Sequence, residues 1–261
     1  MDDWRQRCTS NEEKERVAEE YFQRLYTTTN PNVIREVLDK VDQVVTLAMN
    51  QTLLQPYSPD EIKQVLFQMH PSKSLSPDSM SPFFFQKYWN IVRSDIIETV
   101  FSVLNSGHFL RKMNYTHIVL IPKINETKTI ADYRPISLAN VISRLVLKVL
   151  ANRLELILPN VISDSQCAFV PNRLITYNTT VVFEVLHRMR NKRTGRKGQM
   201  AIKLDISKAY DRVEWGFLRN IMLKLGFDVR WVQLAMETVC IASYSVLING
   251  EPKDTSIHLG V

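Results

Sequence analysis

Cysteine and glycine are scarce in this chain, with 3 cysteines and 7 glycines among 261 residues. Cys8, Cys167 and Cys240 are odd in number and far apart, so they predict neither a disulfide framework nor a metal-binding cluster. No repeat or low-complexity stretch is present. The pattern is typical of isolated, reduced thiols in an intracellular protein.

Long hydrophobic runs are also missing, because every apolar stretch is short and interrupted by charges. No membrane span is therefore expected. The N-terminus, MDDWRQRC, lacks the apolar segment of a secretory signal, so secretion is not expected either. Apolar residues still make up 45% of the chain. That is enough for a sizeable core in one large domain or two smaller ones.

Acidic residues are few in one part of the chain. The net charge is +6, but residues 1–70 carry 8 basic and 12 acidic groups, whereas residues 144–197 carry 10 basic and 3 acidic groups. A basic segment of this kind suggests a polyanion as partner, most often nucleic acid. For the run RMRNKRTGRKGQ (188–199) alone, a solvent-exposed loop is the simpler interpretation.

Hydrophobic periodicity predicts a mainly helical chain. Ser10 with Glu13, and Ser58 with Glu61, have the spacing of a capping box. The expected helices cover residues 10–26, 58–70, 83–105, 139–158, 173–191, 213–225 and 229–240.

Three short runs predict strands, at 116–122, 200–205 and 243–250. The last of them ends in an Asn-Gly pair, which is a strong hairpin signal, so a return strand is expected near 254–259. Residues 131–138 are expected to form a loop, because Pro135 removes a hydrogen-bond donor and disfavours helix in the residue before it. The order of elements indicates an α+β sheet domain beside a mainly helical region.

The acidic residue Asp205 follows the expected strand 200–205 directly. It could cap the next helix, pair with a cation, or bind Mg²⁺, which prefers carboxylate oxygens. Ser207 and Asp211 lie closer to the helix start, which favours the metal role. Tyr210 has two interpretations: a half-buried core aromatic, or a side chain that lies beneath a nucleotide's sugar.

These residues belong to a longer resemblance. The stretch LDISKAYDRVEW resembles the first catalytic motif of reverse transcriptases, in particular those of LINE-type (non-LTR) retrotransposons of plants. Further blocks of that family resemble YFQRLY, FFFQKYW, IVLIPKINETKTIADYRPISLANVISRLVLKVLANRL (118–154), SDSQCAFVPNRLITYN (163–178) and SYSVLINGEP. They follow the family's order and cover nearly the whole chain.

The resemblance implies an α+β fold: the fingers of a right-hand polymerase plus an incomplete palm. The chain would be mainly helical, with a small, partly unpaired antiparallel sheet. Residues 1–110 would form an N-terminal helical extension, residues 111–199 a fingers-like region, and residues 200–261 a partial palm with the first catalytic motif. An unpaired strand edge is expected at 200–205 or 243–248.

The resemblance also implies roles for single residues. Asp205 would be the first catalytic, metal-binding carboxylate, and Ile206 would lend its backbone carbonyl to the metal ion on the nucleotide side. Tyr210 would exclude ribonucleotides sterically. Arg134 would contact the triphosphate of the incoming nucleotide, and Lys123 would be a second phosphate contact.

The implied partners are an RNA template, a DNA primer and deoxynucleoside triphosphates, with neither a membrane nor a small-molecule cofactor. Mg²⁺ is the cofactor of the full-length family, and weak or absent binding of it is expected for this chain. A nuclear location follows only from the family. Four basic side chains of the segment 144–197 are expected to contact the nucleic-acid backbone. They are Arg144, Lys148, Arg153 and Arg173, of which the first three should lie on the outer face of helix 139–158.

The sequence departs from the family in its carboxylates. Two-metal phosphoryl transfer needs more than one of them, yet Asp-Asp occurs only at Asp2-Asp3. Asp211 and Glu214 lie too close to Asp205 in sequence to replace the family's Asp-Asp hairpin. The chain is therefore expected to be a truncated fragment that is inactive alone. The alternative is a non-catalytic, nucleic-acid-binding remnant of a decayed element.

Glycines of the family are also replaced. The stretch Ser76-Pro77-Asp78-Ser79 stands where Gly-Pro-Asp-Gly is usual, and Asn172 stands where glycine is usual. Serine is unfavourable wherever the replaced glycine had a left-handed backbone, whereas asparagine tolerates that conformation. Tyr177 stands where the family usually has Asp.

Overall fold

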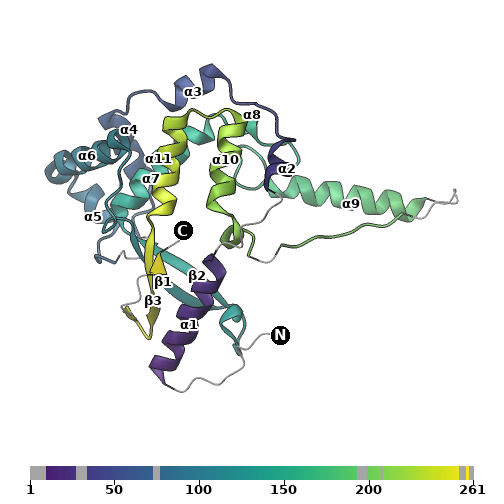
Figure 1. The fold of residues 1–261 in the computed structure, drawn as a ribbon, viewed down its shortest axis with the longest axis horizontal. Helices are drawn as coiled ribbons and strands as arrows, with labels where there is room; N and C mark the ends of the chain where they lie inside the picture. Colours follow the sequence, from purple (N-terminus) through teal and green to yellow (C-terminus); the bar gives the residue numbers. More distant parts are fainter. Residues whose placement is uncertain are drawn as a thin grey trace.

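The computed structural model describes residues 10–27, 34–72, 77–192, 199–206, 208–252 and 257–258. A helical body lies above a small sheet, and one long helix projects from the body (Figure 1). The helices are α1 (Asn11–Tyr26), α2 (Ile34–Leu38), α3 (Leu47–Leu53), α4 (Pro59–Gln68), α5 (Pro82–Lys87), α6 (Trp89–Ser106), α7 (Val141–Glu155), α8 (Leu158–Val161), α9 (Ile175–Asn191), α10 (Trp215–Leu225) and α11 (Val229–Cys240), with the 3-10 turns η1 (Ile130–Asp132) and η2 (Tyr210–Arg212).

The sheet is small and mixed. Its strands are β1 (Tyr115–Pro122), β2 (Tyr133–Ala139), β3 (Ser243–Ile248), β4 (Glu251–Pro252) and β5 (Ile257–His258). The order is β2-β1-β3-β4, and β5 also pairs with β3. β1 is antiparallel to β2 but parallel to β3. The mainly helical fold with a small sheet is thus confirmed, although the sheet is not antiparallel throughout.

The prediction of a loop at 131–138 was wrong, because residues 133–139 form β2. Pro135 lies opposite Leu120 of β1. β2 ends the strand order, so one side of it has no neighbouring strand among the described residues. Proline is tolerated on such an edge strand, where its missing N–H does not break a ladder on both sides.

The helix ends follow the sequence closely. Ser10 and Glu13 form the expected capping box of α1. Ser58 accepts the Glu61 N–H at the start of α4, but the Glu61 carboxylate pairs with Arg153. Gly107 ends α6 with a left-handed backbone. The helix expected at 83–105 is broken at Tyr88 into α5 and α6.

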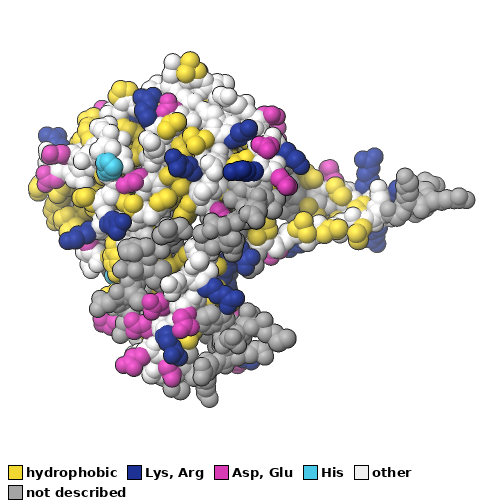
Figure 2. Space-filling model, viewed as in Figure 1, with side chains coloured by type: hydrophobic (Ala, Val, Ile, Leu, Met, Phe, Trp, Pro, Cys, Tyr) yellow, Lys and Arg dark blue, Asp and Glu magenta, His cyan; other side chains and the backbone are white. Residues whose placement is uncertain are grey.

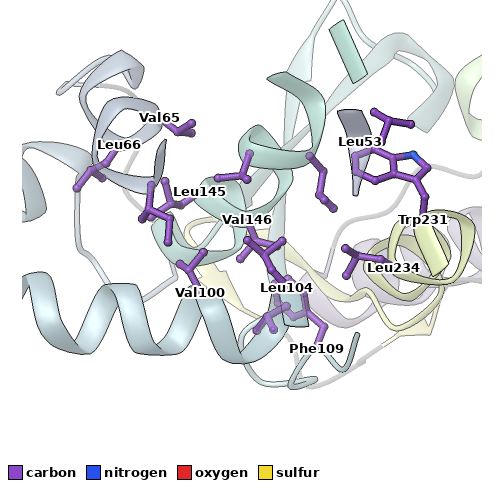
Figure 3. Close-up of a cluster of buried hydrophobic side chains, with 14 of the residues drawn as sticks. Leu53, Val65, Leu66, Val100, Leu104, Phe109, Leu145, Val146, Trp231 and Leu234 are labelled. Atoms are coloured by element: carbon purple, nitrogen blue, oxygen red, sulfur yellow. The ribbon is translucent and has the colours of Figure 1, made fainter. Parts of the chain in front are cut away.

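The main hydrophobic core lies between α7 and the helices around it (Figure 3). From α7, Leu145 and Val146 are fully buried, and Val100 of α6 and Trp231 of α11 pack into the same cluster. Helices from the first, second and last parts of the chain therefore share one core. The division into regions 1–110, 111–199 and 200–261 stays a prediction.

A second, smaller cluster attaches α1 to the sheet. Phe22 of α1 lies against Tyr244 of β3 with ring centroids 6.2 Å apart, and Ile118 of β1 belongs to the same cluster. Tyr26 also contacts the Tyr244 ring edge-on at 5.5 Å. The amphipathic pattern that predicted α1 thus provides the face that covers β1 and β3.

The strand predicted at 200–205 is not formed in the described structure. Residues 199–206 carry no strand assignment and are exposed throughout. Four alternating apolar side chains are exposed by 69% or more: Met200, Ile202, Leu204 and Ile206. Of the two places where an unpaired edge was expected, 243–248 is paired, because β3 pairs with β1 on one side and with β4 and β5 on the other. Residues 200–205 have no strand partner among the described residues.

Two described positions at which the family usually has glycine have a left-handed backbone in this structure. Ser79 has φ 60° and Asn172 has φ 62°. Ser76 lies outside the described residues. The backbone at Ser79 therefore has the conformation that glycine adopts freely and serine does not.

Candidate nucleic-acid and nucleotide interface

The turn that follows Asp205 is exposed. Asp205 and Ile206 are both accessible at the end of the extended segment 199–206, and Tyr210 in η2 is 74% exposed. Tyr210 is therefore not a core aromatic. Asp205 does not cap the next helix either, because α10 has Glu214 at its N-cap position.

The carboxylates of this turn do not form a metal cluster. Among the residues that the structure describes, no group of three or more His, Cys, Asp or Glu side chains could hold an ion. The side chain of Asp205 and the backbone carbonyl of Ile206 supply oxygen donors, which suit Mg²⁺. They fit one part of a magnesium site, and the described residues do not supply the other carboxylates of a two-metal centre.

Helix α1 holds the turn in place, a contact that the sequence did not predict. The Lys208 ammonium donates a hydrogen bond to the Tyr21 hydroxyl and lies 4.3 Å from the centre of the Tyr21 ring. Burial, together with the charge of Asp211, raises the pKa of Tyr26 and of Tyr244 above its usual range. The turn is thus packed onto the aromatic cluster of α1 and β3.

Lys123 and Arg134 lie at the same end of the β1–β2 hairpin. Arg134 is paired in register with Ile121 and is exposed. The Lys123 backbone N–H donates to the Asp132 carbonyl at 2.8 Å, and its ammonium donates to the Ala131 carbonyl at 2.7 Å. The hairpin therefore places both predicted phosphate contacts together, although Lys123 is engaged by its own loop.

Asp132 stiffens that loop. Its carboxylate accepts backbone N–H groups from Lys128 at 2.9 Å and Thr129 at 2.8 Å. These hydrogen bonds lower the pKa of Asp132 from its usual value. Because both η1, which ends at Asp132, and η2 contact α1, one helix connects the hairpin to the turn that follows Asp205.

Arg153 was expected on the outer face of its helix, and this prediction was wrong. The side chain is 8% exposed and pairs with Glu61 at 2.7 Å. Its guanidinium also donates to the backbone carbonyls of Leu53, Gln55 and Pro56. Because these bonds engage all of its nitrogens, Arg153 fastens the segment before α4 to α7 and has no free donor for nucleic acid.

Arg173 is also used within the protein. Its side chain is 15% exposed and ion-pairs with Asp164 at 3.2 Å. It donates to the backbone carbonyl of Pro159 in α8 and to three carbonyls of the segment between α8 and α9, namely Ile162, Ser163 and Gln166. Arg173 therefore clamps the segment between α8 and α9, and its contact with nucleic acid stays a prediction.

Arg144 and Lys148 lie partly exposed on α7. The ammonium of Lys148 is 3.6 Å from the Glu155 carboxylate. Burial lowers the pKa of Arg144, and the charge of Asp78 opposes that shift. Of the four predicted backbone contacts, these two keep a cation near the surface.

Phe169 is a site residue that the sequence analysis did not single out. Its ring lies edge-on to Tyr210 with centroids 6.0 Å apart, and it is 81% exposed. The contact joins the block 163–178 to the turn that follows Asp205. The order of the two blocks in the resemblance was the only signal that could have suggested it.

A family model for the reverse transcriptase (RNA-dependent DNA polymerase) matches residues 121–258, which is more than half of the chain. The chain belongs to this family. The match includes the second half of the hairpin, the loop clamped by Arg173, the turn at Asp205 and most of the sheet. It therefore spans both sides of the contact between Phe169 and Tyr210.

Three curated relatives are similar to the chain. A 149 kDa protein of transposon TX1 from Xenopus laevis is 28% identical over 89% of this chain. Pol polyproteins from the type-1 retrotransposable element R2 of Nasonia vitripennis and Popillia japonica are 30% and 26% identical over 63% and 47% of it. The chain spans 18%, 15% and 16% of the lengths of these relatives. Among the described helices, none is long and apolar enough to cross a membrane.

Proposed function

We propose that this chain provides the fingers and the first catalytic motif of an RNA-directed DNA polymerase encoded by a non-LTR retrotransposon. The observation that carries the proposal is the exposed turn with Asp205 and Tyr210, which α1 connects to the hairpin with Lys123 and Arg134. The finer assignment to LINE-type elements of plants rests on the sequence blocks alone. Action in the nucleus would follow from that assignment.

Asp205 and Ile206 would bind Mg²⁺ through the carboxylate and the backbone carbonyl. When bound, the two ions of such enzymes stabilise the attacking and leaving oxygens of phosphoryl transfer. The exposed Arg134 would bind the triphosphate through its guanidinium fork. Tyr210 would lie beneath the sugar and exclude a 2′-hydroxyl. Its accessibility supports this role, since a buried ring could not contact a substrate.

The partners would be an RNA template, a DNA primer and deoxynucleoside triphosphates. Arg144 and Lys148 remain as candidates for contacts with the nucleic-acid backbone. Such contacts give affinity that falls with salt and depends little on sequence.

We further propose that these 261 residues do not catalyse synthesis by themselves. The described residues hold no cluster of metal ligands, and Asp211 belongs to the same turn as Asp205. The remaining carboxylates would have to come from residues that this structure does not describe or from another chain. The second candidate function is that of a non-catalytic, nucleic-acid-binding remnant, which the exposed Arg188 and Arg190 of α9 favour.

Primer extension on an RNA template with Mg²⁺ tests this proposal, with the wild-type chain and Asp205→Ala compared side by side. We expect no incorporation by either. Incorporation that disappears in Asp205→Ala would contradict the claim of incompleteness and would show that a second carboxylate lies within these residues.

The metal role of Asp205 can be tested without synthesis. Titration with Mn²⁺ should broaden the amide NMR signals of Asp205 and Ile206 first, and Asp205→Asn should abolish that selectivity. Asp95→Asn, at an exposed position of α6, is the matched control and should leave it unchanged. Broadening centred on another acidic residue would contradict the assignment.

A further inference from the structure

Two exposed aromatic rings meet where the loop before α9 approaches η2. Phe169 and Tyr210 are 81% and 74% exposed. Their centroids are 6.0 Å apart and their planes are inclined by 86°. In an edge-to-face pair the rings cover little of each other, so aromatic surface remains open to a flat ligand.

The neighbouring residues of the loop keep the Phe169 side chain in solvent. Cys167 and Val170 on either side are buried, 5% and 7% exposed. The Cys167 thiol also donates a hydrogen bond to the Asn178 side chain at 3.3 Å. Arg173 fixes the rest of the loop through its ion pair with Asp164 and its bonds to backbone carbonyls. The position of the Phe169 ring is therefore set by the loop's own interactions.

The backbone of Phe169 is strained. Its φ is 63°, which is unfavourable for a bulky side chain. Burial does not explain the strain, because the ring is largely in solvent. Strained positions of this kind persist where surrounding structure fixes them, and they gather at ligand sites.

The surroundings of the pair suit a nucleotide. Arg212, two residues after Tyr210, is exposed, and so is Lys203 in the extended segment that leads to this turn. Aromatic rings next to basic side chains are the usual means of binding nucleobases together with their phosphates. Asp205 and Asp211 also lie near Tyr210 in the sequence. In the proposed function Asp205 meets the nucleotide through Mg²⁺, so a carboxylate beside the pair is compatible with a nucleotide.

We propose that Phe169, together with Tyr210, forms a stacking surface for a nucleobase. The inference rests on the proposed function, since it extends the nucleotide site from Tyr210 to the loop clamped by Arg173. The base could belong to a single strand or to a free nucleoside triphosphate. The stacking chemistry is the same, so the experiment distinguishes the two sources.

The test is equilibrium binding of two probes to the full chain. One probe is a fluorescein-labelled single-stranded 12-nucleotide RNA, and the other is a fluorescent deoxyguanosine triphosphate with Mg²⁺. Phe169→Ala and Phe169→Leu should each weaken binding of at least one probe by about 5- to 100-fold, because stacking is lost in both. Phe83→Ala, at a 54% exposed phenylalanine of α5, is the matched control and should change binding less than twofold.

The two probes show whether the base belongs to a strand or to a nucleoside triphosphate. A loss confined to the RNA probe assigns the surface to a strand, and a loss confined to the triphosphate assigns it to the incoming nucleotide. Either supports the inference. Unchanged binding of both probes by Phe169→Ala overturns it and leaves the proposed function intact. Absence of any binding by the wild-type chain at low salt overturns both.

Folding is checked with Phe169→Gly. Glycine relieves the left-handed strain at this position, so the melting temperature should stay the same or rise while binding falls. A structural role for the ring would lower both. Asp95→Asn, at an exposed position of α6, should bind the RNA probe like the wild type, which controls for the loss of an acidic side chain elsewhere on the surface.

Discussion

Helices α7 and α9 are of similar length and each has an apolar stripe, yet the structure uses them in opposite ways. In α7, Val141, Leu145, Val146 and Val149 are fully buried. In α9, none of the described residues is buried. Figure 2 shows hydrophobic side chains along the projecting arm, where α9 leaves the body (Figure 1). Periodicity thus reveals a helix, whereas burial depends on what surrounds it.

Their basic residues differ in the same way. Arg153 of α7 is enclosed by carbonyls and Glu61, whereas Arg188 and Arg190 of α9 are exposed. A count of arginines in the segment 144–197 would treat all three alike. The comparison teaches that net charge indicates a class of partner and cannot indicate which cations remain free to meet it.

The largest expected effect is at Arg153. Arg153→Ala would leave the Glu61 carboxylate and three backbone carbonyls without their donor, and removal of one partner from a buried pair costs about 3 to 5 kcal/mol. Chemical denaturation should show this loss in the free energy of unfolding. Lys148→Ala is the matched control on the same helix. Its partly exposed pair with Glu155 should contribute less than about 1 kcal/mol. Similar losses in both variants would contradict the distinction between buried and surface cations.

The same Leu→Ala substitution in each helix tests the comparison of α7 with α9 most directly. Leu145→Ala in α7 removes a fully buried side chain and should lower the free energy of unfolding by about 3 kcal/mol. Leu186→Ala in α9 makes the same chemical change at a 46% exposed position and should cost less than about 0.5 kcal/mol. Helix propensity changes equally in both, so the difference isolates burial. A loss above about 1 kcal/mol at Leu186 would show that α9 is covered in solution.

These contrasts also show what the sequence could predict. Caps such as Ser10 and Ser58 depend on neighbours three residues away, so the local pattern was sufficient. The same holds for the hairpin turn, where Asn249 and Gly250 both have positive φ.

Residues 200–205 illustrate the opposite case. Their alternating pattern favours a strand, but a strand also needs a hydrogen-bonding neighbour, and none pairs with them among the described residues. Arg153 with Glu61 and Phe169 with Tyr210 are contacts between distant segments. Such pairs depend on the assembled fold, so spacing along the chain could not reveal them.

The smallest effect concerns two left-handed loop positions, one before α5 and one before α9. Ser79→Gly should raise the free energy of unfolding by about 0.5 to 1 kcal/mol, because the relief of strain exceeds the entropy that glycine adds to the unfolded chain. Asn172→Gly should gain less, since asparagine tolerates this conformation better.

Denaturation of the two glycine variants measures both effects, and Ser102→Gly supplies the control. Ser102 is exposed within α6, where glycine should instead destabilise by about 0.5 kcal/mol. A gain at Ser79 with a loss at Ser102 would show that backbone conformation, and not the removal of a hydroxyl, decides the sign. If Ser79→Gly destabilised the protein, the left-handed turn would not be the reason why glycine suits that position. Serine in place of glycine at position 79 would then cost no more conformational free energy than asparagine does at position 172.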